Sequence, residues 1–237
     1  MRFYVNNFCY LSAENKSSLT DGRHCFDKHE LPKLDWVAPM QRRRLSAFTK
    51  MALYCASEAN RDRDPIPVVF SSRHGDLHKT ASLLDSLALN ESLSPARFSM
   101  SVHNASAGLL SILTNNKAAS NTVSAGKESL LMAIIDAYAK LMNDNNEQVL
   151  VVHCDQALPI EYIGYQDEKQ IDHCLAFIMS KNITTGEELI IEHREQSALD
   201  ENTILPHGIV FGEFLTNKHN DCLLHGRRSN WFVKAIT

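Results

Sequence analysis

The sequence has no hydrophobic run long enough to cross a membrane. Its strongest apolar run, residues 130–135, stops at Asp136, whereas a spanning helix needs about 20 apolar residues. Residues 1–7 contain a single arginine with no uninterrupted apolar stretch after it, so they lack the pattern of a secretory signal. These absences predict a cytoplasmic protein.

The chain also lacks an excess of positive charge and any paired-cysteine motif. Lysine and arginine total 24 against 28 acidic residues, for a formal net charge of −4. The usual electrostatic basis for binding a nucleic-acid backbone is therefore missing. The six cysteines are scattered without a Cys-x-x-Cys pair, which argues against structural zinc and a disulfide framework. We expect reduced, packed thiols.

Composition and periodicity predict one α/β domain spanning residues 1–237. Apolar residues make up 44% and charged residues 22% of a chain without repeats or linkers, which is typical of a globular domain. Strand-like segments alternate with helical spacing, which predicts a mostly parallel sheet covered by helices and a short mixed C-terminal extension. The expected strands are 3–11, 65–70, 118–124, 149–152, 183–191 and 208–215, and the expected helices are 41–60, 102–113, 125–142 and those starting after Asp76 and Ser94.

One polar turn, residues 73–78, places two histidines and a carboxylate between a strand and a helix. Catalytic groups often occupy such turns. A structural role explains the same residues: Arg73 and Asp76 orient the turn, Gly75 supplies an unusual backbone angle, and His74 and His78 lie on the surface. We favour the structural role.

A second motif, residues 104–108, is similar to the Gly-x-Ser-x-Gly nucleophile elbow, with Asn104 in place of the first glycine. That elbow needs a strand immediately before its serine. Helical spacing already begins near Val102, so the context is wrong for a hydrolase. The small residues favour a close backbone or helix contact instead.

The stretch 98–112, with its Val-His-Asn, Ala-Gly and Ser-Ile pairs, resembles the N-terminal part of the β-ketoacyl synthases. Residues 68–76, followed by Ser94-Pro95 and then this stretch, resemble the short ketosynthase-like chain-length factors of aryl polyene gene clusters in Gram-negative bacteria. The resemblance covers the first two thirds of the chain; the last third matches only in length and in Trp231. It implies a thiolase-like, half-length ketosynthase fold.

The chain departs from the enzyme pattern at the nucleophile. Ketosynthases carry a cysteine at the head of a buried helix, where the helix N-terminus lowers the thiol pKa. Counted without gaps from Ala107-Gly108, that position falls near Lys127, and no cysteine lies between Cys55 and Cys154. An acylated amine would be an amide that cannot pass its acyl chain onward. Alternatively, Lys127 is an exposed lysine in a first helical turn, without chemistry.

The paired histidines of a ketosynthase belong to a second half for which this chain has no room. His207, His219 and His225 lie in the tail but lack the family's glycine-flanked setting, so we expect surface or structural roles. The resemblance therefore implies no catalytic residue, and we expect no cofactor and no metal.

Because ketosynthases are two-fold dimers that pair the strand before the nucleophile across their interface, residues 119–124 imply a heterodimer with a catalytic β-ketoacyl synthase. An acyl carrier protein would meet this complex at the ketosynthase entrance; nucleic-acid binding and membrane insertion are not expected. Side chains at the seam would shape the acyl tunnel. The candidate seam or tunnel residues, any of which can instead belong to the core, are Phe98, Met100, Val102, His103, Asn104, Ala107, Gly108, Leu109, Ile112, Thr122, Val123 and Ser124.

Two other functions remain open from the sequence. One is an acyltransferase or thioesterase that uses Ser106, Ser124 or Ser129 as its nucleophile. The other is a structural stabiliser of a ketosynthase without influence on product length.

Overall fold

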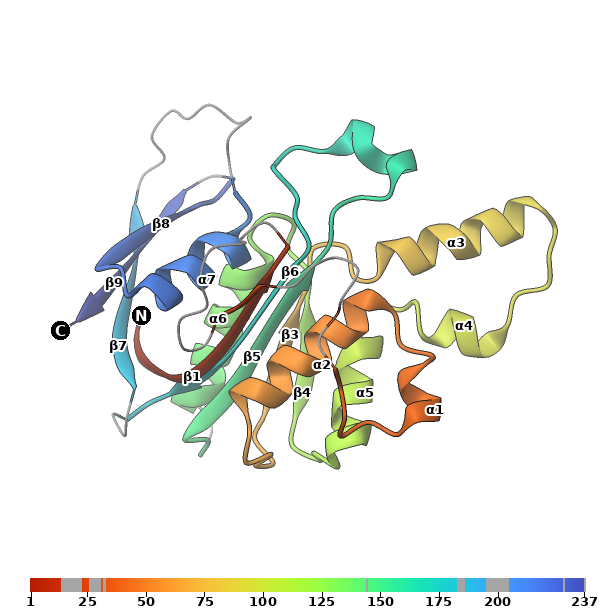
Figure 1. The fold of residues 1–237 in the computed structure, drawn as a ribbon. Helices are drawn as coiled ribbons and strands as arrows, with labels where there is room; N and C mark the ends of the chain where they lie inside the picture. Colours follow the sequence, from red (N-terminus) through yellow and green to blue (C-terminus); the bar gives the residue numbers. More distant parts are fainter. Residues whose placement is uncertain are drawn as a thin grey trace.

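The main feature of the fold is one mixed sheet with helices packed on both faces (Figure 1). The computed structural model describes residues 1–13, 23–25, 31, 33–143, 145–182, 186–194, 205–227 and 229–236. Within these ranges, none of the helices has the length and apolar character needed to cross a membrane. The expected α/β architecture is confirmed.

The described residues form nine strands in this sheet. In spatial order they are β4 (Ser120–Val123), β3 (Val68–Ser71), β5 (Gln148–Asp155), β6 (His173–Ser180), β1 (Arg2–Ser12), β7 (Glu187–Arg194), β9 (Asn230–Ile236) and β8 (Asp221–His225), and β2 (Arg23–Cys25) pairs with β1.

The sheet is mixed rather than mostly parallel. Only β4, β3 and β5, together with the β1–β2 pair, are parallel. The neighbours from β5 through β6, β1, β7 and β9 to β8 are antiparallel. The expectation of a mostly parallel sheet is wrong. Helical crossovers connect the parallel strands β3, β4 and β5, but the neighbours from β5 to β8 are antiparallel, and antiparallel strands do not need a helical crossover between them. The expected mixed C-terminal extension is confirmed.

Two helix pairs sandwich the sheet. Helices α2 (Ala47–Ala59) and α5 (Ala105–Thr114) share one apolar core with the sheet, and α6 (Ser129–Asn143) and α7 (His207–Asn217) share the other. The short α1 (Pro39–Arg42) precedes α2. Helices α3 (Leu77–Ala88) and α4 (Pro95–Ser99) project from the body as an arm, and the 3-10 helix η1 (Ile160–Tyr165) lies in a protruding loop (Figure 1).

The cysteines behave as the sequence predicts among the described side chains. Cys9, Cys55, Cys154 and Cys174 are buried free thiols, and Cys222 is a half-buried one. The side chain of the sixth cysteine, at position 25, lies outside the described ones.

Residues 208–215, expected as a strand, belong to helix α7. Two glycines and the β-branched Ile209 and Val210 weaken the local helix signal. Packing against the sheet decides the conformation. Gly208 and Gly212 lie four residues apart on one face of the helix, and the helix meets the sheet at this face. A Cβ atom on Gly212 would lie 2.4 Å from the Tyr10 ring, so these glycines allow close packing.

Gly212→Ala should therefore lower the free energy of unfolding by about 1–3 kcal/mol, because the added methyl overpacks the α7–sheet contact. Gly108→Ala is the matched control, since Gly108 is also helical but a Cβ there has nothing within 4 Å. That variant should gain about 0.5–1 kcal/mol from helix propensity. Urea unfolding measures both, and equal effects of the two substitutions would contradict this packing.

Candidate functional site

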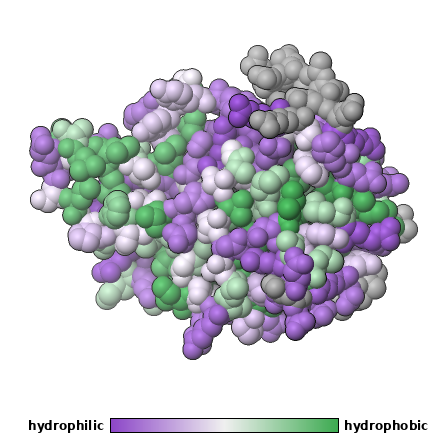
Figure 2. Space-filling view, turned by 180° about the vertical axis from the view of Figure 1, so that it is seen from behind, coloured by the Kyte–Doolittle hydropathy of each residue, from purple (hydrophilic) through white to green (hydrophobic). Residues whose placement is uncertain are grey.

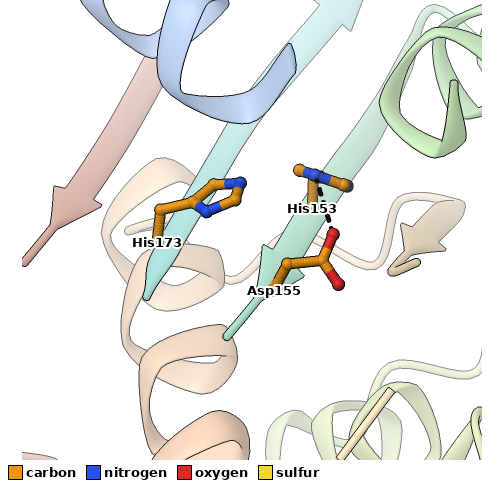
Figure 3. A group of neighbouring side chains, drawn as sticks. All are labelled: His153, Asp155 and His173. Carbon is orange, nitrogen blue, oxygen red and sulfur yellow. Dashed lines mark ion pairs between the residues drawn. The ribbon is translucent and has the colours of Figure 1, made fainter. Parts of the chain in front are cut away.

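Four polar side chains gather at the carboxyl end of β5, on the face that α6 and α7 cover. Alternate residues of a strand share a face, so Ser71 continues the row of buried Val69. Likewise, His153 and Asp155 continue the row of Val149 and Val151. Cross-strand pairing places Ser71 beside His153 and Asp155 opposite His173. The register of three strands thus assembles the site (Figure 3).

A hydrogen-bonded chain connects three of these groups with the next turn. Ser71 Oγ lies 3.0 Å from His153 Nδ1, and His153 Nε2 lies 3.3 Å from Asp155 Oδ2. Asp155 Oδ1 accepts hydrogen bonds from Ser72 Oγ at 2.7 Å and from the backbone N–H of Arg73 at 2.8 Å. With a neutral imidazole whose proton is on Nε2, Ser71 donates to Nδ1, and the Nε2 side of the ring faces the Asp155 carboxylate as a close polar contact.

Three histidines in this region are buried and neutral. Burial lowers the pKa of His153 to about 3 and the pKa values of His173 and His207 to about 4. His173 Nδ1 donates to the carbonyl of Ile171 at 2.7 Å, and His207 Nε2 donates to the carbonyl of His225 at 2.9 Å. The uncharged form is favoured because an apolar interior disfavours the imidazolium.

The order Ser71–His153–Asp155 is that of a nucleophile, a base and an orienting acid. Ser71 has no exposed surface, and His153 is 3% exposed. A substrate carbonyl therefore has no route to the hydroxyl. The chain of hydrogen bonds joins β3 to β5 and does not form a hydrolase site.

The three serines proposed as nucleophiles lie elsewhere. Ser106 is buried and shares a hydrogen bond with Thr49 at 3.1 Å. Ser129 is buried and donates to the carbonyl of Gly126 at 2.7 Å. Ser124 is exposed and donates to a backbone carbonyl at 3.0 Å. Their hydrogen bonds within the described part of the chain run to hydroxyl and backbone groups, none to a histidine that could act as a base.

The turn after β3 has the structural geometry that the sequence predicts. Gly75 has φ +65°, and Asp76 caps α3 by accepting a hydrogen bond from the backbone N–H of Lys79. The side chains of His74 and His78 are exposed. This turn is therefore a structural element that orients the arm.

Arg73 connects the same turn to the loop before β6. Its guanidinium lies 2.8 Å from Asp167 and 2.9 Å from Glu168. Burial raises the pKa of Glu168, whereas the cations Arg73 and Lys127 outweigh burial and lower the pKa of Asp167. Arg73 thus fixes the loop over the carboxyl end of the sheet.

Lys127 is part of this network and is not an exposed lysine in a helical turn. Helix α6 begins two residues later, at Ser129, after a turn in which Gly126 has φ +60°. Lys127 Nζ donates to the carbonyl of Asp167 at 2.8 Å and lies 3.6 Å from its carboxylate. The side chain is half-buried and engaged at the head of α6.

A small recess of about 10 Å³, room for roughly one water molecule, lies beside the polar cluster. The complete lining is Arg73, His74, Asp155, Gln156, Glu168, Gln170, Ile171, His173 and Pro206.

The seam candidates separate into an edge strand and a partly exposed helical surface. Strand β4 ends the sheet, and its Thr122 and Val123 are half-buried, with Ser124 exposed just beyond. Phe98, Val102, Asn104, Gly108 and Ile112 are exposed, and Met100, His103 and Leu109 are half-buried.

Ala107 differs from the other candidates because it is buried in the core shared by α2 and α5. Leu109 packs partly against that core. His103 donates from Nε2 to the carbonyl of Ser72 at 2.8 Å, which ties α5 to the turn after β3. These three residues have structural contacts, whereas Phe98, Val102 and Ile112 face outward.

The tail histidines have the surface or structural positions that the sequence predicts. His207 is buried, His225 is half-buried and His219 is exposed.

Sequence reasoning did not identify His153, Asp155 and His173 as a cluster. A usable signal was present, because a His-x-Asp sequence directly follows the buried residues 149–152. The position of His173 gave no such signal, since strand β6 was not expected.

The buried histidines should make folding sensitive to acid. The unfolded chain binds protons below the ordinary histidine pKa of 6.5, but the folded protein does not until about pH 4. Stability should therefore fall as the pH decreases, by about 2 kcal/mol for each histidine between pH 7 and pH 5. Urea unfolding in metal-free buffer measures this loss. His207→Gln, which keeps a donor for His225, should show a loss about one third smaller. A pH-independent unfolding free energy would contradict the neutral cluster.

Comparison with solved structures shows the fold of the ketosynthases. A ketosynthase (ApeO) in complex with its chain length factor (ApeC) from Xenorhabdus doucetiae matches with a TM-score of 0.82 and 23% identity, over 99% of both chains. The ishigamide ketosynthase/chain length factor matches with a TM-score of 0.55 and 18% identity over 66% of this chain and 51% of that one. A type II acyl-carrier protein in complex with its ketosynthase (AntDE:AntF) matches with a TM-score of 0.59 and 15% identity over 82% and 70%.

No curated protein sequence shows significant similarity to the chain. The family model for the beta-ketoacyl synthase N-terminal domain matches residues 17–232. The match extends well beyond the first two thirds, where the sequence motifs were found. Together with the thiolase-like fold, it establishes that the chain belongs to the β-ketoacyl synthase N-terminal domain family.

Proposed function

We propose that the chain is a non-catalytic chain-length factor, which pairs with a catalytic β-ketoacyl synthase and shapes its acyl tunnel during aryl polyene elongation. One observation carries this proposal: the head of α6 presents Lys127, held by Asp167, near the position that the family resemblance assigns to the nucleophile. The sequence has no cysteine between Cys55 and Cys154.

The chemistry of thioester transfer explains why this substitution matters. A ketosynthase must accept an acyl group and then release it to a carbon nucleophile, which requires a good leaving group such as a thiolate. Lys127 offers an amine, and acylation of that amine would give a stable amide. The nearby hydroxyl of Ser129 is buried and already donates to a backbone carbonyl. The head of α6 therefore suits a subunit without its own acyl-transfer step.

The surface supports association with a partner through β4. Backbone groups of alternate residues in a strand point to opposite sides, and the carbonyls of Ala119 and Val123 accept hydrogen bonds from β3. The N–H of Thr122 therefore points to the open edge of the sheet. An unpaired edge is a ready template for a strand of another chain.

Exposed apolar side chains on α4, on α5 and between these helices support binding of a protein partner. Phe98 is 58% exposed, Val102 is 42% exposed and Ile112 is 74% exposed. Seen from behind, hydrophobic residues gather on the projecting arm of α3 and α4 (Figure 2). Exposed apolar surface of this kind is typical of interaction sites.

The similar structures favour a ketosynthase as this partner, since two of them contain a ketosynthase with a chain-length factor. One contains an acyl-carrier protein with its ketosynthase, in line with a carrier protein that meets the complex at the ketosynthase entrance. Chain length would be set sterically, because one methylene in an apolar pocket changes binding by about 1–3 kcal/mol.

The first test uses co-expression with a catalytic β-ketoacyl synthase from the same genome. Thr122→Pro removes the outward N–H and places the proline ring at the open edge, whereas Thr122→Val keeps the N–H as a matched control. We expect a one-to-one complex for the unmodified chain and for Thr122→Val. Thr122→Pro should bind at least about 30-fold more weakly, equivalent to about 2 kcal/mol, as measured by calorimetry.

Thermal melting establishes whether Thr122→Pro is folded. Equal affinity of a folded Thr122→Pro variant would contradict pairing through β4. Turnover of acyl thioesters by the purified chain alone would contradict a non-catalytic role and favour the serine-dependent alternative.

The second test examines the length of the polyene made by the complex. Phe98→Ala should shift the product distribution, because removing a large apolar side chain enlarges any cavity that it lines. Met142→Ala is the control, since Met142 is also an exposed apolar residue but lies on α6, outside the arm and the seam candidates. Mass spectrometry of the products gives the distribution. Unchanged lengths for Phe98→Ala, Ile112→Ala and Val123→Ala in intact complexes would favour the structural stabiliser.

A further inference from the structure

The polar corner at the ends of β5 and β6 contains three side chains that can act as metal ligands. His153, Asp155 and His173 each contribute one ligand atom, and these atoms all lie within 4.8 Å of one another (Figure 3). We propose that these residues bind a divalent transition-metal ion of the zinc class. The proposal depends only on the geometry of this corner and is independent of the proposed function.

The distances suit an ion of this size. His153 Nε2 and Asp155 Oδ2 are 3.3 Å apart, which is roughly the edge of a tetrahedron with metal–ligand bonds of about 2.0–2.1 Å. His173 supplies the third ligand atom, which lies within 4.8 Å of the other two. Two imidazole nitrogens with one carboxylate favour a transition-metal ion over calcium or magnesium, which prefer oxygen ligands.

His173 is oriented as a ligand. A carbonyl oxygen can only accept, so the 2.7 Å contact between His173 Nδ1 and Ile171 places the ring proton on Nδ1. Nε2 therefore carries a lone pair, and this buried atom has no hydrogen-bond partner in the described part of the chain. Buried polar atoms nearly always have a partner. Metal-binding histidines typically donate their other N–H to a carbonyl or carboxylate in this way.

The other two ligands have comparable support. Asp155 Oδ1 is held by Ser72 and by the N–H of Arg73, which leaves Oδ2 for an ion. The Ser71 hydroxyl beside His153 Nδ1 can accept as well as donate. When an ion binds Nε2, the single ring proton of His153 moves to Nδ1 and donates to Ser71. The net change is a tautomer shift without release of a proton.

The three ligands lie between a small recess and the start of α7. The recess is lined by both Asp155 and His173, and it has room for one water molecule at a fourth coordination position. A Cβ atom on Gly208 would lie 2.4 Å from His173 Nε2, so the start of α7 packs directly against the ring. No metal site was predicted from the sequence, because metal-binding motifs are recognised by the spacing of ligands along the chain. These three ligands instead come together from two neighbouring strands.

The test uses Zn²⁺ alone with the full chain after treatment with a chelator. We expect one tightly bound Zn²⁺ per chain by calorimetry, and a Tm increase of about 5 °C or more at a hundredfold excess over Kd. His173→Asn removes Nε2 but keeps an N–H for Ile171, and it should weaken binding by at least about 30-fold. The control is His219→Asn, because His219 is exposed and distant in sequence from the cluster; its affinity should be unchanged.

Two outcomes would overturn the proposal. The first is the absence of stoichiometric Zn²⁺ binding to the unmodified chain, and the second is unchanged affinity in a folded His173→Asn variant. If the His173→Asn variant does not fold, anomalous scattering at the zinc absorption edge, measured on crystals of the unmodified chain, locates the bound ion. A peak among His153, Asp155 and His173 supports the proposal, and a peak elsewhere refutes it.

Discussion

The Asp155 carboxylate holds the polar corner at the ends of β5 and β6 together. It accepts hydrogen bonds from the Ser72 hydroxyl and the Arg73 N–H, and it pairs with the His153 ring. Ser72 Oγ in turn accepts from the N–H of Gly75 at 2.8 Å. One half-buried carboxylate thus connects the end of β5 with the turn that starts the α3 arm. Because hydrogen bonds to a charged acceptor are among the strongest in proteins, the position of the arm depends on this residue.

Two electrostatic layers surround that carboxylate. The inner layer consists of histidines that burial keeps neutral, so it places no unpaired charge in the core. The outer layer is the ion-pair network of Arg73, Lys127, Asp167 and Glu168, in which each charge has a partner. This network joins the head of α6 to the loop before β6. A head of α6 that is engaged in structural contacts accords with a subunit that contributes shape to a complex.

Local signals predicted much of the fold. The apolar run before Ser71, the Asp76 cap of α3 and the Ser94 cap of α4 were all correct, because each depends on residues within one or two turns. The prediction for residues 208–215 was wrong, since the helix there depends on how Gly208 and Gly212 fit against the sheet. Strand β6 was not expected, although it lies in the middle of the sheet.

The sequence by itself determined the α/β class, the starts of α3 and α4 and the family resemblance, because periodicity, caps and motifs depend on neighbouring residues. The starts of α2 and α6 were placed too early, at residues 41 and 125 rather than at Ala47 and Ser129. Only the tertiary structure decided that the sheet is mixed and that His153, Asp155 and His173 meet. Their meeting depends on the antiparallel register of β5 and β6, and a shift of one residue would turn the ligands to the opposite face. Register is set by packing across the whole sheet, which local sequence patterns do not encode.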